Sequence, residues 1–143
     1  LDIPLFFSEI KKLYQRSVEL NIIEADTHIR RLYSYGARKI NDIIGRGGTN
    51  FDEVISYANQ ASISRDQSES PIELWNSGGW TETRKIKTSD SFDGLIYFTD
   101  GVAPRITVRP RIPVLWVLAG RYVITEDSEE YANLPGNKVL IQK

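Results

Sequence analysis

Three features of the sequence predict an α/β fold, a three-layer sandwich with a Rossmann-like, mostly parallel sheet. The segments 94–99 and 112–119 are continuous apolar runs, too apolar for a sheet with one face in water, so each is expected to be a central strand covered on both faces. Apolar residues at helical spacing begin at Ile3 and again at Phe51, and they predict two helices that cover the faces of this sheet. The length of 143 residues fits a single domain, 1–143.

The first part of the chain is predicted as a helix followed by a hairpin. Apolar residues recur at helical spacing from Ile3 to Tyr14. The segments 18–25 and 29–35 are rich in β-branched and aromatic residues and are predicted as strands. The link between them, 26–28, is short enough for a hairpin.

A second helix and a long polar insertion follow. Residues 51–61 carry apolar side chains on one face and are predicted as a helix. The polar stretch 62–93 is longer than most connections in compact domains. Within it, two β-prone runs at 72–75 and 80–86 flank a glycine turn, which predicts a β-hairpin that projects from the domain.

The end of the chain is predicted as a connection and a strand. Residues 122–133 are predicted to be an acidic connection. Residues 138–142 are predicted as a last edge strand.

The composition excludes several classes of function. A formal net charge of -1 provides no long-range attraction to nucleic acid or anionic lipid, so binding to either is not predicted. The absence of cysteine excludes disulfides, cysteine zinc sites and thiol catalysis, and the single histidine, His28, excludes histidine pairs. No apolar stretch approaches the roughly 18 residues that span a bilayer, and no secretory signal is visible, so a cytoplasmic protein is expected.

Two loops far apart in the sequence carry oxygen ligands. One precedes the second helix and ends in Gly-Gly-Thr-Asn, and the other is the Thr-Asp-Gly that follows an apolar strand. Because loops at the carboxyl ends of parallel strands gather at one edge of a sheet, Thr49 and Asp100 are predicted to lie together and to bind Mg²⁺ or Mn²⁺. The remaining residues of this predicted site are Gly47, Gly48, Asn50 and Gly101.

Simpler roles for several of these residues stay open. Asp-Gly is a common turn pair, which would make Asp100 a turn residue, and Thr49 or Asn50 is also placed to cap the following helix. No Gly-Lys-Ser/Thr follows the glycines, so a nucleotide-binding loop is not predicted. Trp75 and Trp80 flank the glycine turn of the insertion, where they form either an exposed recognition surface or the packing of the hairpin onto the body.

The Gly-Gly-Thr at 47–49 and the Thr-Asp-Gly at 99–101 resemble two of the three motifs of the metal-ion-dependent adhesion site in von Willebrand factor A domains. Pro-Val-Leu-Trp-Val at 113–117 is similar to a segment of a bacterial group of these domains that is often found after a metallopeptidase-like domain. The resemblance covers most of the chain outside 62–93. It implies a protein partner whose carboxylate completes the coordination of the metal.

One motif of that family has no counterpart in this sequence. The Asp-x-Ser-x-Ser motif and the strand that precedes it are missing, so the resemblance implies an incomplete or vestigial site with metal weakly bound or absent. The missing strand is a central one in the family, so an upstream segment, a second chain or a rearranged pairing is expected to fill its place. The chain begins at Leu1 and contains no Met, as expected for a fragment.

These observations favour a non-enzymatic protein-interaction domain. The alternative is a regulatory subunit or C-terminal domain of a metallopeptidase-like or ATPase-linked enzyme. A third class is a Rossmann-like hydrolase that uses Asp100 with a metal. The sequence shows no Ser-His-Asp, Cys-His or paired-carboxylate pattern, which argues against enzymatic roles.

Overall fold

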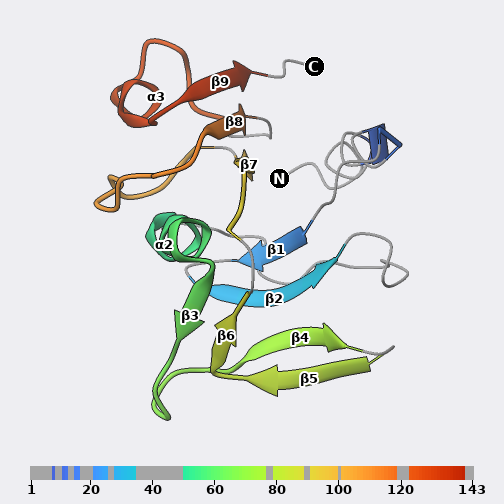
Figure 1. Cartoon of the computed structure of the whole chain (residues 1–143). Helices are drawn as coiled ribbons and strands as arrows, with labels where there is room; N and C mark the ends of the chain where they lie inside the picture. Colours follow the sequence, from blue (N-terminus) through green and yellow to red (C-terminus); the bar gives the residue numbers. More distant parts are fainter. Residues whose placement is uncertain are drawn as a thin grey trace.

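The computed structural model (Figure 1) describes residues 8, 11–12, 15–16, 21–25, 28–34, 50–76, 79–88, 91–99, 101–118 and 123–140. Its elements are β1 (Asn21–Ala25), β2 (Ile29–Ser34), α2 (Asp52–Gln60), β3 (Ser62–Ser64), β4 (Ile72–Asn76), β5 (Gly79–Thr83), β6 (Lys85–Lys87), β7 (Leu95–Thr99), β8 (Val114–Leu118), α3 (Glu129–Asn133) and β9 (Asn137–Leu140). The described strands form three sheets, with orders β1-β2-β4-β5, β3-β6 and β7-β8-β9.

The sheet β7-β8-β9 is parallel throughout, so the prediction that the two apolar runs are parallel strands is confirmed, and the structure adds that they are neighbours. The register of β7 and β8 runs from Leu95 opposite Val114 to Thr99 opposite Leu118. β8 lies between its two neighbours, and Trp116 and Leu118 are fully buried there. β9 forms the edge, as predicted for the end of the chain. β7, expected to be central, is the other edge strand of this sheet among the described residues.

The sheet β1-β2-β4-β5 contains both predicted hairpins. β1 and β2 are antiparallel, and so are β4 and β5. The second hairpin does not project, because β4 pairs with β2 in parallel, with Arg31 opposite Glu73 and Leu32 opposite Leu74. The prediction of one mostly parallel sheet is therefore corrected: the described α/β structure has several sheets with parallel and antiparallel pairs. The pairing of β2 with β4 joins residues about 40 positions apart in the chain. It was not predicted, because the order of side chains within a short segment does not specify a distant partner strand.

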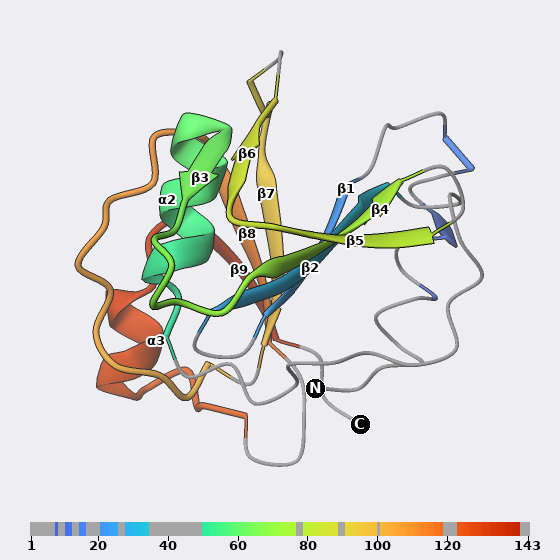
Figure 2. The same ribbon diagram turned by 90° about the horizontal axis from the view of Figure 1, so that it is seen from below.

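Helix α2 joins two hydrophobic cores, and its bounds match the helix predicted at 51–61. On one side, Phe51 and Ile55 pack with Trp116 and Leu118 of the parallel sheet. On the other side, the core comprises residues of α2, β2 and β4: Val54, Tyr57, Ile29, Leu32 and Ile72. Figure 2 shows α2 and α3 on the same side of the strands.

Two further differences from the sequence analysis concern the helices. The helix predicted from Ile3 to Tyr14 falls outside the described residues, apart from Ser8, Lys11 and Lys12, which are helical. The acidic connection at 122–133 contains α3, which Ser128 caps by accepting a 3.2 Å hydrogen bond from the backbone N–H of Tyr131. No helix among the described residues has the length and apolar character needed to cross a bilayer.

Candidate functional site

The amino end of α2 lies beside the turn between β1 and β2 and beside the end of β7. Glu53, in the first turn of α2, accepts a 2.7 Å hydrogen bond from the backbone N–H of Ile29 at the start of β2. Phe51, which precedes the helix, lines the same pocket as Gly101, which follows β7. We call this end of the molecule the carboxyl rim, defined by Asn50–Glu53, Thr99 and Gly101.

The opposite end of α2 lies beside the segment that leads into β7. The carbonyl of Ala61 accepts a 2.9 Å hydrogen bond from the backbone N–H of Thr88, and the ring of Tyr57 lies 5.5 Å from that of Phe92. β7 therefore runs from the carboxyl half of α2 toward its amino end, as β1 does. The carboxyl ends of these two strands accordingly lie toward the carboxyl rim, which is the edge where parallel strands present functional loops.

The rim contains the described neighbours of the predicted metal ligands. Thr49, Gly47, Gly48 and Asp100 lie outside the described residues, whereas Asn50 and Gly101 are described and both belong to the rim. The Oδ1 of Asn50 accepts a 2.9 Å hydrogen bond from the backbone N–H of Asp52, the first residue of α2. This contact is an Asx turn that precedes the helix, whereas the N-cap position is Phe51 and has no side-chain capping hydrogen bond, so the capping role predicted for Asn50 is corrected.

The turn after β7 is fixed on both sides of position 100. The backbone N–H of Gly101 donates a 3.1 Å hydrogen bond to Oγ1 of Thr99, whose side chain is buried. Gly101 has a φ of 86°, in the left-handed region that favours glycine. A Cβ at this position would lie 2.5 Å from Cδ1 of Ile124. Thr99 and Gly101 are therefore held in this conformation at the carboxyl end of β7.

A pocket of about 220 Å³ opens at the rim. It has an apolar part that includes Phe51 and Leu134. Its polar lining residues are Arg105, Glu129, Glu130 and Asn133. Pockets that hold small organic ligands usually measure roughly 300–1,000 Å³. This pocket is smaller, so its size suits one side chain of a partner or a hydrated ion better than an organic substrate.

The loop between β7 and β8 forms one wall of the pocket and is tied to α2 by Asp52. The carboxylate of Asp52 accepts hydrogen bonds from the backbone N–H and the hydroxyl of Thr107, at 2.9 and 2.6 Å, and from the backbone N–H of Val108 at 3.1 Å. Burial acts to raise the pKa of Asp52, but these hydrogen bonds outweigh it and hold the pKa below its ordinary value.

Asn59, two turns further along α2, holds the same loop at a second point. Its Nδ2 donates a 2.9 Å hydrogen bond to the carbonyl of Arg109, and its Oδ1 accepts one of 2.6 Å from the backbone N–H of Arg111. The pocket wall is therefore anchored along the length of α2.

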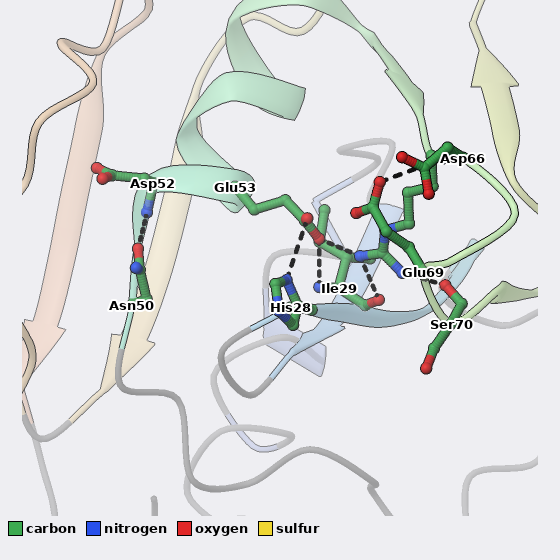
Figure 3. Close-up of polar contacts among 9 residues, drawn as sticks. His28, Ile29, Asn50, Asp52, Glu53, Asp66, Glu69 and Ser70 are labelled. Atoms are coloured by element: carbon green, nitrogen blue, oxygen red, sulfur yellow. Dashed lines mark hydrogen bonds and ion pairs between the residues drawn. The ribbon is translucent and has the colours of Figure 1, made fainter.

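A second polar cluster lies on the other side of the start of α2. Figure 3 shows Asp52 and Glu53 projecting in opposite directions from the helix, with His28 and Ile29 beside Glu53. The guanidinium of Arg65 forms an ion pair with Glu53 and donates a 2.8 Å hydrogen bond to the carbonyl of Ile29. It also donates a 3.0 Å hydrogen bond to the carbonyl of Ser70. Arg65 therefore connects α2, the start of β2 and the loop before β4.

The Glu53–Arg65 pair was not predicted from the sequence, because Arg65 belongs to a polar stretch without a recognisable motif. In the sequence, Arg65 is visible only as a single positive charge, and nothing near it indicates that this charge is buried or paired. The side chain of Arg65 is 3% exposed, so the pair is a buried structural contact. The Nδ1 of His28 lies 3.4 Å from Oε2 of Glu53, and 58% of the His28 side chain is exposed.

Trp75 and Trp80 lie directly opposite each other on β4 and β5. Their ring centroids are 5.2 Å apart at an interplanar angle of 78°. Trp80 also lies 5.9 Å from the ring of Tyr33, and the guanidinium of Arg31 lies 4.8 Å from the centroid of the Trp80 ring. Both tryptophans are half-buried, and packing accounts for their positions. A recognition role for them stays a prediction.

The described side chains do not by themselves form a site for a divalent cation. Mg²⁺ requires about six oxygen ligands in near-octahedral geometry. Within the described part of the chain, no three side chains of His, Asp or Glu converge in a way that would hold a metal ion. The Oδ1 of Asn50 is already used by the backbone of Asp52.

Comparisons with known proteins returned no matching family model, no matching curated protein and no matching solved structure.

Proposed function

We propose that this chain is a non-enzymatic protein-interaction domain that docks a partner at the carboxyl rim. The proposal includes an incomplete divalent-metal site of the adhesion type, to which Thr49 and Asp100 contribute oxygen ligands. The observation that supports it is a small pocket that Phe51 and Gly101 line together, because these two residues lie within two positions of Thr49 and Asp100 in the chain. A metal held mainly by water would leave positions open for a carboxylate of the partner.

The metal part of the proposal is tested by thermal unfolding during titration with Mg²⁺ or Mn²⁺. At ten times the dissociation constant, binding to the folded state adds roughly 1.4 kcal/mol. For a domain of this size that corresponds to a rise in Tm of about 3–6 °C. Asp100→Ala is expected to abolish the rise, whereas Asp93→Ala, at the amino end of β7, is expected to retain it. A rise that Asp100→Ala leaves unchanged would contradict the proposed ligand.

The docking part is tested separately by a photo-crosslinking amino acid placed at Asn50 on the rim, or at Asp93 at the other end of β7. We expect a discrete crosslinked protein from position 50 only. The crosslink should weaken when Asp100 is replaced by Ala or when the divalent metal is chelated. Equal crosslinking from both positions would place the interaction elsewhere and overturn the proposal.

A further inference from the structure

Three exposed arginines lie on the loop between β7 and β8. They are Arg105, Arg109 and Arg111, and we call them the arginine row. Between them, the apolar side chains of Ile106 and Val108 turn inward and pack against the core shared by α2 and the parallel sheet. Figure 2 shows this loop as the orange trace on the outer side of α2. The loop therefore presents positive charge to solvent along the helix.

The guanidinium groups of the arginine row are unpaired within the described part of the chain. None of the three takes part in an ion pair or a side-chain hydrogen bond there. By contrast, Arg31 and Arg65 are paired with Glu73 and Glu53. The sequence 101–125 contains no Asp or Glu, although the net charge of the whole chain is -1. Positive charge is therefore concentrated on this loop, and no described carboxylate pairs with it.

The loop is held through its backbone, which leaves the arginine side chains available to a ligand. The side chain of Asn59 binds the carbonyl of Arg109 and the N–H of Arg111. Pro110, between them, restricts its own φ to about −65°. Asp52 holds the loop nearer the pocket, and its carboxylate is occupied by the groups of the loop that it binds. A loop that is fixed before binding loses less conformational freedom when a ligand binds, which favours affinity.

We propose that the arginine row binds an extended, acidic segment of a partner polypeptide along the outer side of α2. A guanidinium group binds a carboxylate in a bidentate manner, so Asp and Glu side chains are suitable ligands. The two residues of α2 that hold the loop, Asp52 and Asn59, are about 10 Å apart along the helix axis. An extended segment of roughly five residues covers this distance and continues toward Arg105.

A polypeptide fits this surface better than a single-stranded nucleic acid does. Proteins that bind single strands combine positive charge with aromatic side chains on which the bases stack. In the described part of the chain, the large apolar side chains that are exposed are Ile96, Val102 and Val139, and none of them is aromatic. The net charge of -1 also provides no long-range attraction to a phosphate backbone. Short-range pairs with carboxylates require neither feature.

This inference deepens the proposed function, and it rests on that proposal for the partner being a protein. It does not use the metal site, because the arginine row belongs to the loop between β7 and β8 and only Arg105 also lines the pocket at the rim. Binding is therefore measured with a chelator of divalent metals present. Failure of the proposed metal site would then leave the binding of an acidic segment unchanged.

The test uses a fluorescein-labelled peptide of alternating Glu and Ser, about ten residues and roughly 33 Å long when extended. Its binding to the chain is measured by fluorescence anisotropy. We expect saturable binding that weakens as the ionic strength rises, because salt screens pairs of exposed charges. A peptide of alternating Gln and Ser is expected not to bind.

Two double variants separate the arginine row from general positive charge. Arg109→Gln with Arg111→Gln is expected to weaken binding about tenfold, because two charge pairs are lost while the backbone contacts with Asn59 stay. Lys85→Gln with Lys87→Gln is the matched control, since it removes two exposed charges at the same spacing from β6. This control should retain the affinity within about twofold. Circular dichroism and Tm verify that both variants are folded.

The proposal is wrong if both double variants lose affinity to the same extent, since that would show a general effect of charge. Tighter binding of oligothymidylate than of the acidic peptide would assign the arginine row to nucleic acid and overturn the proposal. Absence of saturable binding to the acidic peptide would also contradict it. That last result would leave the metal titration and the crosslink from position 50 unaffected, so it is distinct from a failure of the proposed function.

Discussion

At the scale of single residues, the turn after β7 depends on the absence of a side chain at Gly101. Its φ of 86° is unfavourable for other residues, and the space that a Cβ would need is occupied by Ile124. The hydrogen bond from Gly101 to Thr99 forms only in this conformation of the turn. The described conformation of the turn after β7 thus depends on glycine at position 101.

Gly101→Ala is expected to lower the free energy of unfolding by about 2–3 kcal/mol, because backbone strain adds to the contact with Ile124. Urea denaturation followed by circular dichroism measures this change. Gly79→Ala is the control, since a Cβ there meets nothing within 4 Å, and it should change stability far less. Similar losses in both variants would show that the turn at Gly101 is not constrained as described.

At the scale of elements, α2 organises the rim by holding the loop between β7 and β8. Asp52 binds this loop at Thr107 and Val108, and Asn59 binds it at Arg109 and Arg111. Because both side chains project from one helix, displacement of α2 would carry the pocket wall with it. Stability of the loop is therefore coupled to stability of the helix.

Asp52→Asn is expected to lower the free energy of unfolding by about 1–2 kcal/mol at pH 7, because the loop loses an ionised acceptor. The pKa of Asp52 is lowered in the folded protein, so its contribution is present above the unfolded pKa of about 3.9 and is lost as pH falls through the folded pKa. The difference in the free energy of unfolding between the native protein and the Asp52→Asn variant should therefore become smaller below about pH 4. Urea denaturation at pH 7 and pH 3 measures it. Glu126→Gln, an exposed change of equal charge, is the control, and a pH-independent difference would contradict the assignment.

At the scale of the whole molecule, β7 connects the two cores. Tyr97 packs against both, and its ring stacks on Trp116 at 5.1 Å and meets Phe51 edge-on at 4.9 Å. Burial raises the pKa of the Tyr97 phenol well above its ordinary value, so the group stays neutral. Because one side chain contributes to both cores, the two sheets are expected to unfold together.

Tyr97→Ala is expected to lower the free energy of unfolding by about 3–5 kcal/mol, as for other large aromatic truncations in cores. Amide exchange should accelerate in β2 and in β8 alike, since both sheets lose packing. Tyr131→Ala is the matched control, because Tyr131 is half-buried and packs only against the core around Trp116, and it should cost about 1 kcal/mol. Faster amide exchange in β8 but not in β2 would show that the two cores unfold independently.

The order of apolar, polar and turn-forming residues within short segments was sufficient to predict most helices and strands of the described chain. The apolar runs that became β7 and β8, the amphipathic pattern of α2 and the glycine turn between β4 and β5 each result from side-chain periodicity or turn chemistry within a few residues. The joint placement of Thr49 and Asp100, which lie outside the described residues, stays a prediction from the direction of parallel strands. α3 was missed because its five residues lie in an acidic segment with little periodicity.

The sequence by itself determined the mixed α/β character and the two hairpin pairs, because each depends on residues close together in the chain. Only the tertiary structure decided that β4 joins β2, that Arg65 is buried against Glu53, and that the pairing stops between β1 and β7 among the described strands. These features depend on contacts between distant segments, whose hydrogen-bonding groups are the same in every strand. Side-chain packing in the folded chain therefore decides which strands pair, because backbone hydrogen bonding alone does not distinguish between them.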